Sequence, residues 1–242
     1  MNTEHHHIEV SGMQVEIVRK DIKNLHIGVY PPHGRVRAAA PLRYDDEAVR
    51  LAVISRLSWI RKQQKVFEQQ DRQSEREMVS GETHFFRGRK YRLDVIETNE
   101  TPEVRLASNK RMEIKIRPGT GADKKRDILR QWYRKKLKEQ IPELLTKWEE
   151  VMGVQVNEVK IKIMKTRWGS CNIEAKRIWL NLELIKKPTA CLEYILVHEM
   201  THLFERHHTE RFRKLMDQFM PDWRLRRDQL NESPLAHEEW EY

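Results

Sequence analysis

Two histidines and a glutamate stand within the five residues HEMTH, as His198, Glu199 and His202. A spacing of four residues is just over one turn of an α-helix, so both imidazoles would project from one face and reach a single tetrahedral metal ion. Glu199 follows the first histidine, which lets its carboxylate reach a metal-bound water without ligating the metal. This HExxH pattern predicts a zinc-dependent hydrolase with Glu199 as the general base.

The third metal ligand is expected just beyond this helix, because a catalytic zinc site needs three protein ligands and one open position. His207 and His208 follow at a distance that permits a tight return of the chain. We predict His208 as the third ligand and keep His207 as the alternative. Without the upstream motif, either residue would be interpreted as a solvated histidine at a helix end.

Residues upstream of the motif are candidates for contacts with a substrate. An edge strand beside the predicted helix can pair with an extended peptide and align it across the metal. Arg167 and Asn181 are candidates for binding the substrate, and Arg167, Asn181 or Arg206 could stabilise an oxyanion. Trp168 and Gly169 are better explained by packing, with the indole beneath the helix and the glycine permitting a close backbone approach.

The motif must lie on a helix that holds it in place. Pro188 and Thr189 mark the start of this helix, and apolar residues then recur at spacings of three to four. Residues 154–164 and 177–184 carry β-branched or apolar side chains at period two, which predicts a small antiparallel sheet. An earlier helical pattern contains Pro142, which would kink that helix or start a second one. The predicted buried face of the motif helix comprises Leu192, Ile195, Leu196, Met200 and Leu203.

The first half of the chain mixes two kinds of pattern. Residues 9–44 alternate apolar and polar side chains and contain turn signals, which predicts short strands and hairpins. From residue 45 toward Gln70, apolar residues recur every three to four positions and predict one long helix. A polar linker follows, and residues 85–96 and 104–116 then predict further strands.

Bulk composition narrows the class of protein. The chain has 242 residues, a net charge of +9 and 38% hydrophobic residues, enough for a core of ordinary size. Two cysteines, Cys171 and Cys191, are too few for a disulfide-stabilised framework, and no segment has the apolar length of a signal peptide or a membrane span. We therefore expect a cytoplasmic protein with no membrane partner. The adjacent histidines at positions 5–7 are interpreted as a solvated tail.

Seven motifs occur in a characteristic order along the chain. They are GRVRAAAP at 34–41, WIRKQ at 59–63, FRGRKYRLDV at 86–95, RWGSC at 167–171, IWLNLEL at 178–184, LEYILVHEMTHL at 192–203, and His208 with Phe212 ahead of Pro221-Asp222-Trp223. Together they resemble the YgjP-like metallopeptidase family, which is related to the SprT-like zinc proteases. The resemblance covers nearly the whole chain, and its motifs are highly specific in combination. It implies a zincin-like core in which His198, His202 and His208 bind zinc and Glu199 is the catalytic base.

The expected fold class is α+β. The turn-rich RPGTGAD at 117–123 marks an internal boundary. Residues 1–117 would form a β-rich N-terminal region with one long helix, and residues 118–242 a small zincin-like core whose HExxH helix packs on the antiparallel sheet. Both regions belong to one family-length unit. Two positions depart from the family pattern, since Arg213 stands where Trp is usual and Thr201 where Cys is common, and neither touches a predicted ligand.

Three classes of function fit these patterns. The first is a metallopeptidase acting on a peptide or protein. The second is a metal-dependent nucleotide pyrophosphatase, which the basic charge permits although the sequence lacks a GxxxxGK[ST] phosphate loop. The third is a nucleic-acid-associated protein with structural zinc, which is disfavoured because structural sites normally use four protein ligands. No pattern indicates an oligomeric state. In the third class the phosphate contacts would come from Lys124, Lys125, Arg126, Arg134, Lys135 and Lys136.

Overall fold

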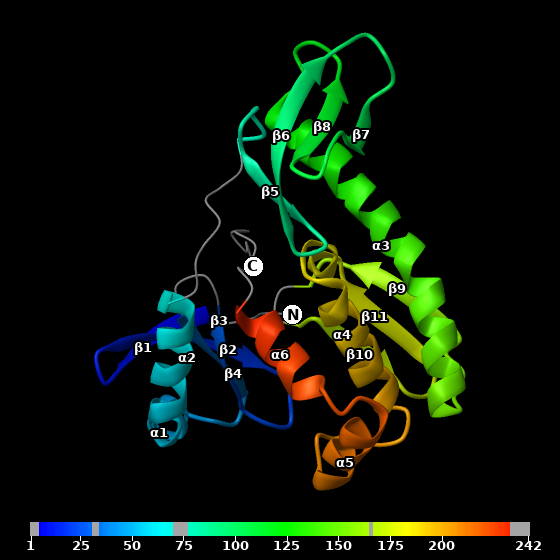
Figure 1. The fold of residues 1–242 in the computed structure, drawn as a ribbon. Coiled ribbons are helices and arrows are strands. Elements are labelled where there is room, and N and C mark those ends of the chain that lie inside the picture. Colours follow the sequence, from blue (N-terminus) through cyan, green and yellow to red (C-terminus); the bar gives the residue numbers. More distant parts are fainter. Residues whose placement is uncertain (1–4, 31–33, 70–76, 165–166, 233–242) are drawn as a thin grey trace. The chain divides into compact units, whose positions relative to one another are not determined.

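The computed structural model describes residues 5–30, 34–69, 77–164 and 167–232 (Figure 1). These residues form two compact units, the first up to residue 69 and the second from residue 77 onward. Both combine helices with small sheets, so the α+β class predicted from the sequence is confirmed. None of the helices within the described ranges has the length and apolar character needed to cross a membrane.

The first unit is a four-stranded mixed sheet with two helices packed against it. Its central pair, β2 and β4, is parallel, and the two outer pairs are antiparallel. Buried side chains from the strands meet Val49 and Val53 of the first helix in a small core of their own. The elements are β1 (His5–Val10), β2 (Met13–Lys20), β3 (His26–Tyr30), β4 (Arg35–Pro41), α1 (Asp46–Ser55) and α2 (Leu57–Gln69), with the strands in the order β1-β2-β4-β3.

Two features of this unit differ from the sequence-based expectations. The single helix expected after residue 45 is divided, because the backbone at Arg56 leaves helical geometry and its N–H donates back to the Val53 carbonyl. The histidines at 5–7 are part of strand β1 rather than a solvated tail. Pairing with β2 engages the backbone groups on one side of this edge strand, and two of the rings meet carboxylates. These contacts join His5 to Glu16 at 3.3 Å and His6 to Asp46 at 2.8 Å.

The second unit begins with another four-stranded mixed sheet, which packs against the long helix that follows it. Leu93, Met112 and Ile114 of this sheet share one core with Leu129 and Tyr133 of the helix. The boundary predicted at residues 117–118 therefore falls inside the second unit, because the apolar face of the helix is buried by the strands that precede it. The elements are β5 (Thr83–Phe86), β6 (Arg89–Glu97), β7 (Glu103–Leu106), β8 (Arg111–Ile116) and α3 (Ala122–Met152), with the strands in the order β5-β6-β8-β7.

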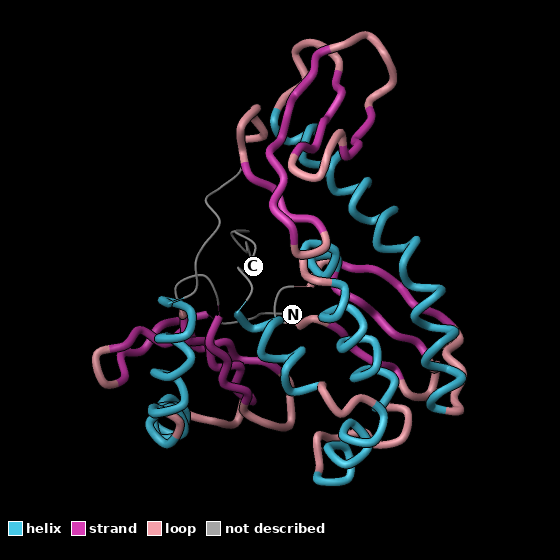
Figure 2. The backbone as a smooth tube through the Cα atoms, in the orientation of Figure 1, coloured by secondary structure: helices cyan, strands magenta, loops and turns pink. Residues whose placement is uncertain are grey.

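Helix α3 is one uninterrupted helix despite Pro142. Figure 2 shows it as a continuous helical tube over its whole length. Tyr133, Leu137 and Ile141 lie on its buried face before the proline, and Trp148 continues that face after it. Packing along this face holds the helix together across the missing backbone hydrogen bond of proline.

The remaining elements surround the HEMTH motif. A three-stranded sheet has β11 at its centre, with β10 antiparallel on one side and β9 parallel on the other. The sheet is therefore mixed, which corrects the antiparallel sheet predicted from the sequence. The cause is the path of the chain, because β10 and β11 form a hairpin and β9 pairs with the free side of β11. The elements are β9 (Glu158–Lys162), β10 (Gly169–Asn172), β11 (Arg177–Asn181), the 3-10 helix η1 (Leu182–Lys186), α4 (Thr189–Thr201), α5 (Glu210–Phe219) and α6 (Trp223–Glu232).

A charged group on α4 joins three helices of this unit. The Glu193 carboxylate accepts hydrogen bonds from Lys147 Nζ at 2.7 Å and Trp148 Nε1 at 3.0 Å on α3, and it pairs with Arg226 on α6. Burial opposes ionisation of this carboxyl, but its hydrogen bonds to Lys147, Arg226 and Trp148 outweigh burial, so the pKa of Glu193 lies below its ordinary value. The network fixes α4 between α3 and α6.

We expect Glu193→Gln to lower the free energy of unfolding at pH 7 by about 2 kcal/mol, because it removes the charge of a largely buried carboxylate that accepts from the half-buried Arg226, from Trp148 and from the exposed Lys147. A depressed folded-state pKa gives stability that is present above the unfolded pKa and is lost as pH falls through the folded pKa. The difference from wild type should therefore shrink in acid. Urea unfolding of both proteins at pH 7 and pH 3.5 measures it, and a difference independent of pH would contradict the prediction.

Candidate metal centre

Helix α4 presents the first two histidines of the motif on one face. Most side chains of α4 are buried, Leu196 and Met200 completely, whereas His198 and His202 are partly exposed. His198 lies in the last turn and His202 is the residue at the C-terminal cap. Their ring centroids are 5.1 Å apart, as expected for residues separated by one helical turn.

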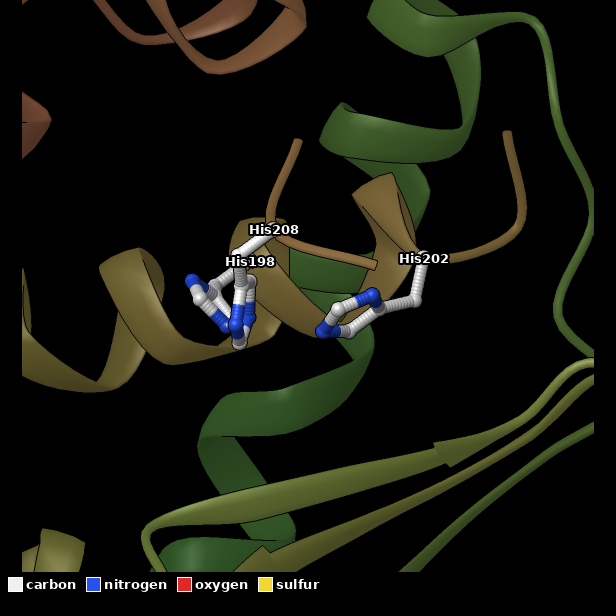
Figure 3. Close-up of side chains that lie close together, drawn as sticks. All are labelled: His198, His202 and His208. Atoms are coloured by element: carbon white, nitrogen blue, oxygen red, sulfur yellow. The ribbon is translucent and has the colours of Figure 1, made fainter. Parts of the chain in front are cut away.

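His208 returns to the same place from the loop after α4. Its ring centroid lies 4.9 Å from those of both His198 and His202, and the three rings point toward one another (Figure 3). One ligand nitrogen from each ring falls within 4.8 Å of the others. His207 is exposed and is not part of this group. Of the two alternatives that the sequence left open, the structure brings His208 to the pair.

An apolar ring holds the three imidazoles in place. Phe212 on α5 is buried, and its centroid lies 5.0 Å from that of His198 and 4.8 Å from those of His202 and His208. Thr209 caps α5 by accepting a hydrogen bond from the Phe212 N–H at 3.3 Å. The cap fixes the start of α5, and with it the positions of Phe212 and of the neighbouring His208.

The chemistry of these nitrogens fits a divalent metal such as zinc. The Nε2 atoms of His198 and His208 lie 3.0 Å apart, close to the separation of about 3.3 Å between two ligands of a tetrahedral zinc ion. His202 Nδ1 lies 3.1 Å from the Glu205 carbonyl oxygen, and a hydrogen bond there leaves Nε2 to bind metal. Burial, followed by the charges of His202 and His208, lowers the pKa of His198 to about 3. The ring is therefore neutral, as a metal ligand must be.

Glu199 is held beside the histidines in a confined space. Its side chain is buried, and the backbone of Gly169 in β10 packs directly against it. Burial raises the pKa of Glu199 to about 8, although the positive charge of Arg167 opposes the shift. The close approach predicted for Gly169 is therefore explained by Glu199.

We expect Gly169→Ala to reduce activity by about 100-fold, because a Cβ there would lie 2.7 Å from both Cγ and Oε1 of Glu199 and displace the carboxylate. Zinc content and unfolding should change little, since the displaced atoms belong to a flexible side chain and not to a ligand. Gly121→Ala is the matched control because nothing lies within 4 Å of its added Cβ. Equal activity in both variants would show that the contact does not position Glu199.

Asn181 is positioned by the loop that leads into β10. Its side-chain nitrogen donates to the carbonyl oxygens of Met164 at 2.9 Å and Arg167 at 2.8 Å. Its side-chain oxygen accepts from the Glu183 N–H at 3.2 Å. Both amide hydrogens are thus engaged with the main chain, so Asn181 shapes this loop and has no N–H left for an oxyanion. The role predicted for it as a substrate contact finds no support in this geometry.

The residues around Glu199 differ in role, since Trp168 packs against the core and Arg167 carries an exposed charge. Trp168 is half-buried against the main core, with Lys187 Nζ 5.5 Å from its ring centroid, in line with the packing role expected for it. Arg167 is exposed, and its charge acts on Glu199. Thr201 is buried, and its hydroxyl donates to the Val197 carbonyl at 2.8 Å. Thr201, which stands where the family commonly has Cys, therefore bonds within α4 and is not among the three converging histidines.

Sequence reasoning missed Tyr194, one turn before His198 on α4. Its ring meets that of His198 edge-on at 5.9 Å and stacks on Trp223 of α6 at 6.4 Å. Burial raises the pKa of Tyr194 to about 12, and Arg227 and Glu199 also act on it. The signal was present in the spacing, since residues at positions 194, 198 and 202 share one helical face.

Residues 23–233 match the model of the YgjP-like metallopeptidase domain. Among solved structures, the chain is similar to the metallopeptidase zymogen of Pyrococcus abyssi abylysin, with 21% sequence identity and a TM-score of 0.35, over 38% of this chain and 91% of that one. No curated protein matches the sequence significantly.

Proposed function

Because the chain belongs to the YgjP-like metallopeptidase family, we propose that it is a zinc-dependent peptidase whose metal is held by His198, His202 and His208, with Glu199 as general base. One observation carries this proposal. Three imidazoles converge within 4.8 Å, and a buried carboxyl stands on the same helix beside the first of them. This donor set matches a catalytic zinc site, which has three protein ligands and a position open to water or substrate.

The proton transfers fall to Glu199. Zinc bound by these histidines would supply Lewis acidity, which polarises a carbonyl group and lowers the pKa of water. Glu199 accepts a proton from the attacking water while the water oxygen bonds to the carbonyl carbon. It then gives that proton to the amine nitrogen as the C–N bond breaks. The contact with Gly169 keeps the carboxylate in one position through both transfers.

The substrate would lie along β10. This strand is at the edge of its sheet, and it packs against α4, so an extended peptide pairing with it would run past the histidines. Arg167 stands just before β10, where a positive charge can stabilise the carbonyl oxygen as it becomes negative.

We expect Arg167→Met to lower kcat by about 10- to 100-fold without loss of zinc, because it removes a charge that acts on the developing oxyanion. Lys176→Met, in the turn between β10 and β11, is the control for loss of a positive charge from the same sheet. Steady-state kinetics on a peptide substrate separates the two variants, and an effect confined to KM would assign Arg167 to substrate binding instead.

The proposal is tested by determining which class of substrate the protein hydrolyses. Zinc-loaded protein is incubated with casein and, separately, with nucleoside triphosphates. Release of peptides from casein with intact nucleotides is the expected result. Release of pyrophosphate or phosphate with intact casein would overturn the peptidase and favour the nucleotide pyrophosphatase.

A further inference from the structure

A groove of about 790 Å³ lies on the second unit between β7 and α3, and none of the metal-site residues lines it. One wall is formed by residues 102–106 and the other by residues of α3, with Phe86 and Arg87 at the end of β5 completing it. Its volume is in the range of sites that bind ligands.

The strand wall offers main-chain groups to a ligand. Side chains of a strand alternate between the two faces of a sheet, so a groove lined by five consecutive residues must run along the strand's edge. β7 is one of the two edge strands of its sheet, and within the described residues it pairs with β8 alone (Figure 1). The open side of β7 can therefore accept another strand.

The helix wall matches the strand in length. Ile128, Gln131, Trp132 and Lys135 are spaced three, one and three residues apart, so they form one stripe along α3. This stripe spans about 10 Å at the helical rise, and the four residues of β7 span about 13 Å in extended form. The groove therefore has the dimensions of one extended segment of four to five residues.

The charged residues that line the groove are mainly positive, and two aromatic rings, those of Phe86 and Trp132, also line it. Arg87, Arg105, Lys135 and Lys136 line it, against one acid, Glu103. Two of these cations are neutralised locally, since Arg105 pairs with Glu113 at 2.6 Å and Lys136 with Glu139 at 2.8 Å.

Arg87 and Lys135 form no ion pair within the part of the chain that the structure describes, although both lower the pKa of nearby Glu139. Trp132 is half-buried, with its ring 4.9 Å from that of Phe86. A ligand with both carboxylates and apolar side chains complements this lining.

We propose that the groove binds an extended acidic polypeptide segment, which adds a strand to β7 and places carboxylates against Arg87 and Lys135. The side chains on one face of that segment, at every second residue, meet the α3 stripe, with apolar ones at Trp132 and Ile128 and an acidic one at Lys135. The groove thus serves as a docking site for a polypeptide apart from the metal centre. Binding there does not depend on the proposed peptidase activity.

The test uses the full-length Glu199→Gln chain without added metal, so that binding is measured independently of cleavage. The probe is a fluorescein-labelled decapeptide, Val-Val-Glu-Glu-Val-Val-Glu-Glu-Val-Val, which carries both Val and Glu on each face of an extended strand. Its binding is measured by fluorescence anisotropy. Arg87→Glu and Lys135→Glu should each weaken binding about fivefold, more so at low salt. Lys138→Glu is the control, because Lys138 is exposed on the same helix outside the groove, and it should change binding by less than about twofold.

Strand addition makes a second, sharper prediction. Two versions of the decapeptide are N-methylated at alternate positions, one on each edge. Only the version whose methylated edge faces β7 should lose binding, because N-methylation removes the donors that would pair with the strand. Equal binding of both versions would overturn strand addition. Binding of oligo(dT) that Arg87→Glu and Lys135→Glu abolish, with no binding of the peptide, would make the groove a nucleic-acid site instead.

Discussion

Glu199→Gln is expected to keep one zinc ion per chain and to lose peptide hydrolysis by about 10²- to 10⁴-fold, because an amide of the same size cannot accept a proton. The substitution is nearly isosteric, which matters in a space where the Gly169 backbone lies directly against the side chain. The three histidines are unchanged, so metal binding should be preserved. Elemental analysis and casein hydrolysis by the same preparations measure the two effects.

Glu210→Gln is the matched control for this experiment. Glu210 is an exposed carboxylate in the first turn of α5, two residues after His208, and it pairs with Arg213 on the surface. Its neutralisation should leave hydrolysis within about twofold of wild type, since exposed pairs contribute little. Full activity in Glu199→Gln would remove Glu199 as the base, whereas loss of zinc in that variant would assign it a role in metal binding.

His208→Ala is expected to weaken zinc binding on the order of 10²- to 10³-fold and to abolish hydrolysis, because two imidazoles remain where three are needed. The stabilisation of the folded chain by zinc should fall with the affinity, so the rise in Tm on adding zinc should shrink. Competition with a zinc-binding dye and thermal unfolding with and without zinc give independent measurements of this loss.

The neighbouring histidine provides the control. His207 is exposed and lies outside the group of converging rings. Its backbone N–H donates to the Glu205 side chain at 3.3 Å. His207→Ala should therefore retain zinc and activity within about twofold of wild type. The opposite outcome, with zinc lost in His207→Ala and kept in His208→Ala, would exchange the two residues in the site and require the loop before α5 to adopt another conformation.

The sequence by itself determined those features that arise from neighbouring residues. The positions of His198 and His202 on one face of α4 follow from helical periodicity, which is a property of five consecutive residues. The membership in the YgjP-like family is likewise carried by linear motifs, and the match over residues 23–233 confirms it. The roles of the three histidines and of Glu199 stay predictions until metal content and activity are measured.

Tertiary structure decided what depends on residues far apart in the chain. The position of the His208 ring beside His198 and His202 follows from its packing on Phe212, and the position of Glu199 follows from a contact with Gly169, thirty residues earlier. The parallel pairing of β9 with β11 and the hydrogen bonds of Asn181 depend in the same way on how the chain returns upon itself. Local periodicity specifies which face of a helix or strand is buried, but the partner that covers that face is selected by packing over the whole unit, which no short window of sequence contains.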